Sequence, residues 1–408
     1  MNALCKGILA GEKPPFEAWK ETLVGYLPWF SRLKDTPQDP VWHGEGNVES
    51  HTRSVLDQVY AQFERHSPAD RLVLVLAALL HDIGKPQMTR QREDGRWISP
   101  HHADRGRSYL ALRLLALQLP WSVYARVLGL VGHHHDPAHL VRQGSGRSSY
   151  ARLARLSDTR LLYDMEQADL RGRIAADLDD QLDVLELFRL SAEEHGCWDE
   201  NPYLGWRNVI EGALNGFDSR VVEATYQCGL SDYESGLIFT PQEALSRGFR
   251  FRKPFPELFV TCGISGSGKS QWIQDNLPGF EVISLDALRA ELSGDSARQS
   301  DNGKVLQLAK ERLKDALRKN KSVVWDATNV KRVFRQLPLG LGFDYGAFVT
   351  LVVFAVSEKI CQQRNQKRDR SVAAGVLTQQ VESFDFPYGD EAHRVYFVDQ
   401  SGDIAQQF

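Results

Sequence analysis

Residues 263–270 read Gly-Ile-Ser-Gly-Ser-Gly-Lys-Ser, the G-x-x-x-x-G-K-S spacing of a phosphate-binding loop. Glycines let a backbone wrap closely around phosphates, and the helix that follows adds unpaired N–H groups and the positive end of its dipole. Lys269 would reach the β- and γ-phosphates, and Ser270 would place its hydroxyl on Mg²⁺. The sequence therefore predicts a site for ATP or another nucleoside triphosphate. Its residues are Gly263, Ser265, Gly266, Ser267, Gly268, Lys269 and Ser270.

A second set of residues suits metal chemistry. His81 and Asp82 follow an apolar helix expected over 71–80, and an ionisable pair at a buried helix end needs a compensating charge such as a divalent cation. Asp82 could bridge two metals while neutral His81 binds one. Imidazole with carboxylate favours Mn²⁺, Fe²⁺, Co²⁺, Ni²⁺ or Zn²⁺, and two such ions could activate a bridging hydroxide. The other candidate ligands are His51, His102, His133, His134 and Asp169.

Several histidines are left open or set aside. The run His133–His135 contains the expected ligands His133 and His134, but the sequence leaves open which two of the three ligate. A single histidine is more often solvated or held in a core than bound to a metal. We therefore expect His43, His66, His139 and His195 not to be ligands.

Further charged residues in the second half suit phosphoryl transfer. Asp286 lies at an expected strand-to-helix corner, with Arg289 one turn later on the same face. The Asp could accept a proton from an attacking hydroxyl, and the Arg could hold a neighbouring phosphate. Arg364 and Arg368 are four residues apart on a later helix and could close over the nucleotide phosphates. An N-capping Asp and a solvated basic helix are the structural alternatives.

The elements that must position these residues fall into two classes. Helical periodicity dominates the first half, whereas strand-like runs at 259–262, 281–284, 322–326 and 348–354 alternate with helices in the second half. The prediction is therefore a helical N-terminal domain followed by an α/β domain with a mainly parallel sheet. The expected boundaries are 1–195, a helical connector at 196–254, and 255–408.

The length and composition of the chain limit its number of domains and its possible partners. A chain of 408 residues suits two or three domains, and its net charge of −4 requires any nucleic acid partner to meet a local basic patch. The five cysteines are scattered without a C-x-x-C pair, which fits free thiols in a reducing cytoplasm. No stretch is apolar and long enough to span a bilayer, so we expect a cytoplasmic protein without a membrane partner. The oligomeric state stays open.

The histidine and aspartate series resembles the H…HD…H…HH…D pattern of the HD-superfamily metal-dependent phosphohydrolases. Matching features are the W-H-x-E-G-x-V-x-x-H-T lead-in at 42–52, H-D-I-G-K-P at 81–86 and D-G-R-W at 94–97. The segment is similar to the HD domain attached to some tRNA nucleotidyltransferases. It departs at residues 101–104, which read His-His-Ala-Asp instead of the family's usual Gly-His-Glu-Glu. The resemblance implies an all-helical fold and phosphoester hydrolysis.

The second half resembles the P-loop 5′-hydroxyl polynucleotide kinases. The features that carry this resemblance are the loop at 263–270, Asp-x-x-Arg at 286–289, D-A-T-N at 326–329 and R-N-Q-K-R at 364–368. It implies that Asp286 is the general base, that Arg289 contacts the phosphate next to the 5′-hydroxyl, and that Arg364 and Arg368 form a lid. Small-molecule kinases of the same build share part of the pattern.

Together the two halves are similar to bacterial fusions of an HD domain with a polynucleotide kinase. The resemblance implies an end-healing enzyme that acts on RNA or DNA strand ends, phosphorylating a 5′-hydroxyl and removing a 2′- or 3′-phosphate or opening a cyclic phosphate. A ligase could act on its products. Three alternatives remain: a nucleotide phosphohydrolase fused to a small-molecule kinase, a regulatory HD module beside an active kinase, and a nucleotide-sensing binding protein. RNA versus DNA preference, physiological metals and choice of nucleotide stay open.

Overall fold

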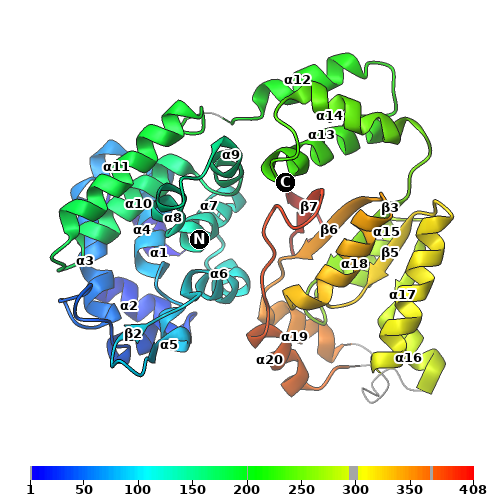
Figure 1. Cartoon of the computed structure of the whole chain (residues 1–408). Coiled ribbons are helices and arrows are strands. Elements are labelled where there is room, and N and C mark those ends of the chain that lie inside the picture. The colour runs from blue at the N-terminus through cyan, green and yellow to red at the C-terminus, as the bar shows by residue number, and fades with distance from the viewer. Residues whose placement is uncertain (1, 200, 294–301, 368–370) are drawn as a thin grey trace. The chain divides into compact units, whose positions relative to one another are not determined.

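The computed structural model describes residues 2–199, 201–293, 302–367 and 371–408. The chain forms two compact units, Met1–Pro202 and Tyr203–Phe408. In these ranges the first unit is helical apart from one short β-ribbon, and the second is α/β (Figure 1). The predicted fold class is confirmed. Among the described helices, none combines the length and hydropathy that a bilayer span requires.

The elements of the first unit follow in chain order, with η marking a 3₁₀ helix. They are α1 (Ala3–Leu9), α2 (Phe16–Val24), η1 (Pro28–Asp35), α3 (Val48–Ala61), η2 (Phe63–Arg65), α4 (Pro68–Leu80), α5 (Lys85–Met88), β1 (Arg90–Gln91), β2 (Trp97–Ile98), α6 (His102–Arg113), η3 (Leu114–Leu117), α7 (Trp121–His133), α8 (Asp136–Arg142), α9 (Arg147–Leu156), α10 (Thr159–Arg171) and α11 (Leu178–Glu194).

Helix α4 is the centre of the first unit. Ser67 caps it by accepting the Asp70 N–H, and Pro68 occupies the first turn, where its missing N–H has no partner to lose. Every residue from Leu72 to Leu80 is buried, against α1, α3, α7 and α10. Each such large apolar side chain contributes roughly 1.5–3 kcal/mol on burial. This packing fixes the position of the two residues that follow the helix, His81 and Asp82.

The second unit contains the remaining elements. They are α12 (Leu204–Ala213), α13 (Ser219–Glu234), α14 (Pro241–Gly248), η4 (Phe249–Arg252), β3 (Glu257–Cys262), α15 (Lys269–Asn276), β4 (Glu281–Ser284), α16 (Leu285–Ser293), α17 (Asn302–Arg318), β5 (Val323–Asp326), α18 (Arg332–Asp344), β6 (Phe348–Phe354), α19 (Glu358–Gln366), α20 (Ala374–Glu382), β7 (Arg394–Val398) and β8 (Ile404–Gln407).

The described strands of the second unit form one sheet in the order β4-β5-β3-β6-β7-β8. All neighbours are parallel except β7 and β8. Strand β3 is buried along its whole length, and its neighbours β5 and β6 lie on opposite sides of it. After β3 the chain forms β4 and β5 on one side of this strand and then β6 on its other side. Parallel sheets bind ligands at such a change of direction, in the crevice beyond the carboxyl ends of the strands. The glycine-rich loop follows directly after β3.

The segment predicted as a connector folds with the sheet. Helices α13 and α14 pack on each other, and α12 packs on both. The Gln407 Nε2 donates to Glu223 Oε1 at 2.9 Å, and Arg220 lies 3.5 Å from the carboxylate of Glu257. These contacts join α13 to strands β8 and β3. Residues 203–252 are therefore part of the second compact unit.

One histidine of this unit predicts an acid-sensitive stability. His393 lies between the rings of Phe343 and Phe348, and its Nδ1 accepts the Val349 N–H at 3.1 Å. Burial lowers the pKa of His393 to about 3, from an ordinary value near about 6.5. Below that ordinary value the unfolded chain binds a proton that the folded chain excludes. The contribution of His393 is therefore complete above about pH 6.5 and falls by at most about 1.4 kcal/mol per pH unit as the pH drops.

The substitution His393→Asn tests this, because its amide oxygen can still accept the Val349 N–H but does not titrate. Urea unfolding of the full chain at pH 7.5 and pH 5.0 should show a smaller loss of unfolding free energy in the variant than in the parent protein. An equal loss in both proteins would assign the acid sensitivity to other groups.

Candidate functional site

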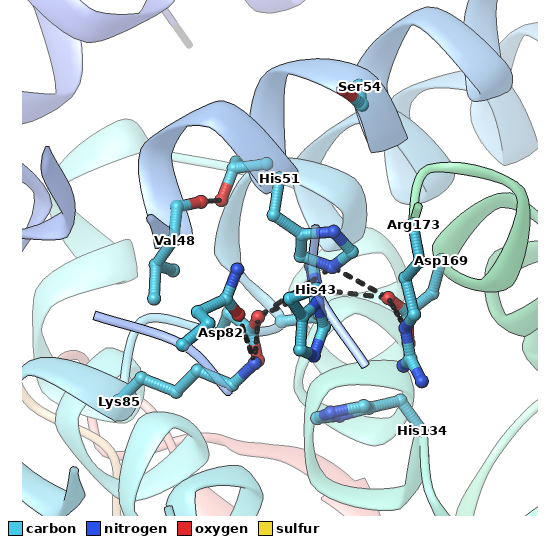
Figure 2. A network of polar contacts seen from close by, with 12 residues as sticks. His43, Val48, His51, Ser54, Asp82, Lys85, His134, Asp169 and Arg173 are labelled. Carbon is cyan, nitrogen blue, oxygen red and sulfur yellow. Dashed lines mark hydrogen bonds and ion pairs between the residues drawn. The ribbon is translucent and has the colours of Figure 1, made fainter. Parts of the chain in front are cut away.

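Helices α3 and α10 bring together the first two predicted ligands. Asn47 caps α3 and thereby fixes its first turn, which carries His51. Asp158 caps α10, whose last turn carries Asp169. Both side chains are buried, and the Nε2 of His51 lies 2.8 Å from the Oδ1 of Asp169 (Figure 2). The structure thus joins two residues that are 118 positions apart.

His81 and Asp82 meet this pair at the end of α4. The Nδ1 of His81 lies 3.0 Å from the carbonyl oxygen of Ala78. Its Nε2 lies 3.3 Å from Asp82 Oδ2 and 3.7 Å from Asp169 Oδ1. In the neutral ring whose Nδ1–H donates to this carbonyl, Nε2 carries the lone pair and faces two carboxylates. This Nε2 is buried without a hydrogen-bond partner, and a bound cation would satisfy both its lone pair and the neighbouring carboxylates.

A second group of imidazoles lies beside Asp82. The Nδ1 of His102 is 2.7 Å from the Ser99 carbonyl, and the Nδ1 of His134 is 2.8 Å from the Val131 carbonyl. Their Nε2 atoms are 3.3 Å apart. The Nε2 of His102 is also 3.1 Å from Asp82 Oδ1. Two unprotonated ring nitrogens that face each other across this distance repel unless a cation lies between them.

The two groups share one carboxylate. Asp82 turns Oδ2 toward His81 and Oδ1 toward His102, so it can contribute to two cation positions. Burial lowers the pKa of His134 to about 3, which keeps the ring neutral, as a ligand must be. Nitrogen donors with carboxylate oxygens fit divalent transition metals. The residues present therefore fit the predicted metal centre.

Two cations offset the charge of the carboxylates. The Nζ of Lys85 lies 2.7 Å from Asp82 Oδ2, and Arg173 pairs with Asp169 (Figure 2). Burial raises the pKa of Asp82, but contacts that favour the carboxylate, first the charge of Lys85, outweigh it and hold that pKa well below its ordinary value. For Asp169 burial is likewise outweighed, first by the charge of Arg173, so its pKa is also well below its ordinary value. Both carboxylates are therefore ionised at neutral pH.

The sequence reasoning missed three of the site's charged residues. Lys85 and Arg173 stand at i+3 and i+4 from the predicted ligands, a spacing that alone could have suggested them. Glu45 belongs to the lead-in motif. Its Oε1 lies 2.8 Å from the Nδ1 of His43 and 2.9 Å from the Nδ1 of His51. His43, expected to lie outside the site, therefore lies with Glu45 and His51 in one group of possible donors.

The structure distinguishes the three histidines of the run His133–His135 by their contacts. His134 and His135 lie with His102 in one group of possible donors, and the Nε2 of His135 is 3.2 Å from that of His102. His133 instead directs Nδ1 toward Asp136 Oδ2 at 2.6 Å. His133 is the last residue of α7 and His135 lies beyond it, so their side chains leave the backbone in different directions. The geometry favours His134 and His135 over the expected His133.

The glycine-rich loop has the predicted form. Gly266 and Gly268 have φ values of +84° and +100°, and a Cβ on Gly266 would lie 2.4 Å from the Cys361 carbonyl oxygen. The Nζ of Lys269 donates to the carbonyls of Gly263 and Ile264, each at 3.0 Å. Lys269 begins α15, so the loop leads into a helix N-terminus as predicted.

The segment after β5 fastens this loop to the sheet. The Gly263 N–H donates to the Thr328 carbonyl at 2.8 Å, and Asn329 donates to the Thr261 carbonyl at 2.8 Å. Asn329 has a positive φ of +47°. Asp326 ends β5 at the same edge of the sheet. The predicted D-A-T-N segment therefore lies against the phosphate-binding loop.

Asp286 and Arg289 occupy the corner after β4, as predicted. Arg289 NH1 lies 2.6 Å from Asp286 Oδ1. The Asp286 side chain is 82% exposed, whereas that of Arg289 is 16% exposed. Strand β4 is parallel to β5, which is parallel to β3. This corner and the glycine-rich loop therefore both lie where the carboxyl ends of the strands meet. A carboxylate at this edge is accessible to a hydroxyl that approaches from solvent.

Arg364 of α19 reaches the loop. Its NH1 donates to the Ser267 carbonyl at 3.4 Å, and its NH2 donates to the Gln400 carbonyl at 2.7 Å. The guanidinium therefore lies over the loop where nucleotide phosphates would bind. The second predicted lid residue, Arg368, lies outside the described residues.

In comparisons with known proteins, each half of the chain matches a protein family. Residues 48–180 match the HD domain family, and residues 258–387 match an AAA domain family. No curated protein matches the chain. Among solved structures, a crystal structure of a gluconokinase from Sinorhizobium meliloti 1021 matches at 25% identity and a TM-score of 0.29, covering 38% of this chain and 87% of that one.

The chain thus carries an HD domain with a candidate metal centre and a P-loop, kinase-like domain with a candidate nucleotide site. The first match spans His51 to Asp169, and the second spans the glycine-rich loop, Asp286 and Arg364. This combination supports an enzyme with phosphohydrolase and kinase activities.

Proposed function

We propose that this protein heals nucleic acid ends: it phosphorylates a 5′-hydroxyl and removes a phosphate from a 2′- or 3′-phosphorylated or cyclic phosphate end. The observation that carries the proposal is the 82% exposure of Asp286 at the nucleotide edge of the sheet. A base so open to solvent suits the end of a long strand, whereas a kinase for a small acceptor benefits from enclosing it. The metal centre supplies the complementary hydrolytic chemistry.

The kinase residues would act on the 5′ end. The 5′-hydroxyl oxygen attacks the γ-phosphorus of ATP, its proton passes to Asp286, and ADP leaves. Lys269 and the loop amides hold the β- and γ-phosphates, and Arg364 meets the charge that develops during transfer. Arg289 would hold the phosphate next to the attacking hydroxyl. Ser270 would hold Mg²⁺, which shields the charge of the phosphates.

The helical domain would act on the other end. Bound divalent ions supply a nucleophilic hydroxide and neutralise the phosphate. His51, His81, Asp82 and Asp169 would hold one position, and His102, His134 and His135 would hold the other together with the second oxygen of Asp82. Lys85 and Arg173 pair with Asp82 and Asp169 and favour the ionised form of both carboxylates. Together the two reactions give a 3′-hydroxyl and a 5′-phosphate, which are the two ends that a ligase joins.

The test uses one oligonucleotide with a 5′-hydroxyl and a 3′-phosphate, made as RNA and as DNA. It is incubated with the full chain, ATP, and Mg²⁺ with or without Mn²⁺, Co²⁺ or Ni²⁺, and mass spectrometry reads both ends. Gain of a 5′-phosphate with loss of the 3′-phosphate supports the proposal. Nucleosides and sugars serve as competing acceptors. Their phosphorylation, with an unchanged oligonucleotide, would instead support a small-molecule kinase.

A further inference from the structure

A cavity of about 330 Å³ lies in the first unit beside the candidate metal centre. This volume is near the lower end of the range typical of ligand sites, about 300–1,000 Å³. Its wall comes from the loop before α3, the ends of α8 and α10, and the start of α11. The lining residues are Trp42, Arg142, Leu170, Arg173, Ala175, Asp177, Leu178 and Gln181.

Part of the cavity's lining is apolar and includes the aromatic side chain of Trp42. Trp42 is 39% exposed, so this large aromatic residue is partly open to solvent. Its loop is fixed on both sides: the Trp42 N–H donates to the Asp39 carbonyl at 3.1 Å, and the Gly44 N–H donates to the Ile174 carbonyl at 2.9 Å. Leu170 and Leu178 continue this apolar surface. A partly exposed aromatic side chain on a fixed backbone is a surface on which a flat ligand can stack.

Another part of the lining is polar and includes two arginines, Arg142 and Arg173. The guanidinium of Arg142 donates to Gln181 Oε1 at 2.5 Å, and the Nε2 of Gln181 donates to Asp177 Oδ2 at 2.8 Å. This chain of contacts orients Arg142 across the start of α11. An arginine together with carboxylate and amide groups suits a ligand that carries both an anion and hydroxyl or amino groups.

The cavity and the metal centre share structural parts. Arg173 lines the cavity and also pairs with Asp169. Glu45, whose Oε1 contacts His51, accepts the Ile174 N–H through Oε2 at 2.9 Å. The loop that carries Trp42 is therefore tied to the residues around His51. A ligand in the cavity would lie beside the carboxylates expected to hold metal.

We propose that this cavity binds the terminal nucleoside of a phosphorylated strand end, with the base stacked on Trp42 and the phosphodiester that leads to the next nucleotide on Arg142. The inference rests on the proposed function and adds how the substrate is recognised. The hydrolytic site would bind the terminal nucleoside as well as the phosphate attached to it. The terminal phosphate then points past Arg173 toward the metal centre.

The test compares two RNA substrates that differ only in the terminal base. One ends in a normal nucleoside 3′-phosphate, and the other ends in an abasic ribose 3′-phosphate. Stacking of a base on an aromatic ring is worth roughly tenfold or more in affinity. The parent protein should therefore show a KM at least about tenfold lower for the normal end, with a similar kcat. In Trp42→Ala this advantage should disappear, and Arg142→Ala should raise KM for both ends.

Tyr26→Ala is the matched control, because Tyr26 is a similarly exposed aromatic, at 42%, away from the cavity. It should keep the full preference for the base. An unchanged preference in Trp42→Ala would overturn the proposal.

A second measurement separates this inference from the proposed function. Adenosine 3′-monophosphate is titrated into the full chain by calorimetry, without any turnover. Binding that is at least about tenfold weaker in Trp42→Ala supports the cavity even if the parent protein hydrolyses no strand end. Equal binding by both proteins, or none by the parent, would refute the nucleoside site.

Discussion

Replacing Asp82 with alanine is expected to lower hydrolysis of a 3′-phosphate by at least about 10³-fold and to leave phosphorylation of the 5′ end unchanged. Asp82 is the carboxylate whose two oxygens face His81 and His102, so its loss removes a ligand from both cation positions at once. It would also leave the Nζ of Lys85 without its buried anion.

Three readouts check this prediction. The two reaction rates are measured on the same oligonucleotide, bound metal is measured by elemental analysis after dialysis, and circular dichroism monitors folding. We expect the variant to lose bound metal along with hydrolysis. Asp57→Ala, on an exposed position of α3, should change none of them. If Asp82→Ala hydrolysed the 3′-phosphate at the parent rate, the assignment of this centre would be wrong.

Asp286→Asn is expected to slow phosphoryl transfer to a 5′-hydroxyl by about 10²- to 10⁴-fold, the range that general bases supply. Asparagine keeps the shape of the side chain and can still accept a hydrogen bond from Arg289, which lies 2.6 Å from Asp286 in the parent protein. It cannot accept the proton of the attacking hydroxyl. The affinity for ATP should therefore stay unchanged while the rate of the transfer step falls.

Single-turnover kinetics with labelled ATP measure this rate apart from binding. Glu291→Gln is the matched control, because Glu291 is an exposed acid on the same helix, α16, and pairs with Arg312. It should transfer phosphate at the parent rate. Parent-like transfer by Asp286→Asn would remove Asp286 from the mechanism and direct attention to Asp326 at the same sheet edge.

Much of the two candidate sites could be predicted because motif residues sit at the ends of regular elements. A buried helix with the stop residues Gly84 and Pro86 fixes the place of His81 and Asp82. A strand, a glycine-rich loop and a helix in this order leave Lys269 little freedom. In such places the local backbone determines the position of the side chain.

Other features of the candidate metal site depend on side-chain directions and burial, which the sequence alone does not determine. Adjacent histidines at the end of α7 differ by roughly 100° in direction in a regular helix, so only the actual backbone path brings His135 to His102 and turns His133 to Asp136. Lys85 and Arg173 have a spacing that is common on solvated helix faces. Only their burial against Asp82 and Asp169 distinguishes them.

Three imidazoles of the candidate metal centre hydrogen-bond through Nδ1 to the main chain, which favours the tautomer with a free Nε2. His81, His102 and His134 each direct Nδ1 to the carbonyl three residues earlier. In many metal sites a carboxylate side chain performs this task, and a single substitution can remove it. Here the acceptor is a peptide group that every residue possesses. The ligand-competent form of these rings is therefore robust to mutation: the residues at 78, 99 and 131 can change identity during evolution while the orientation of the histidines is inherited.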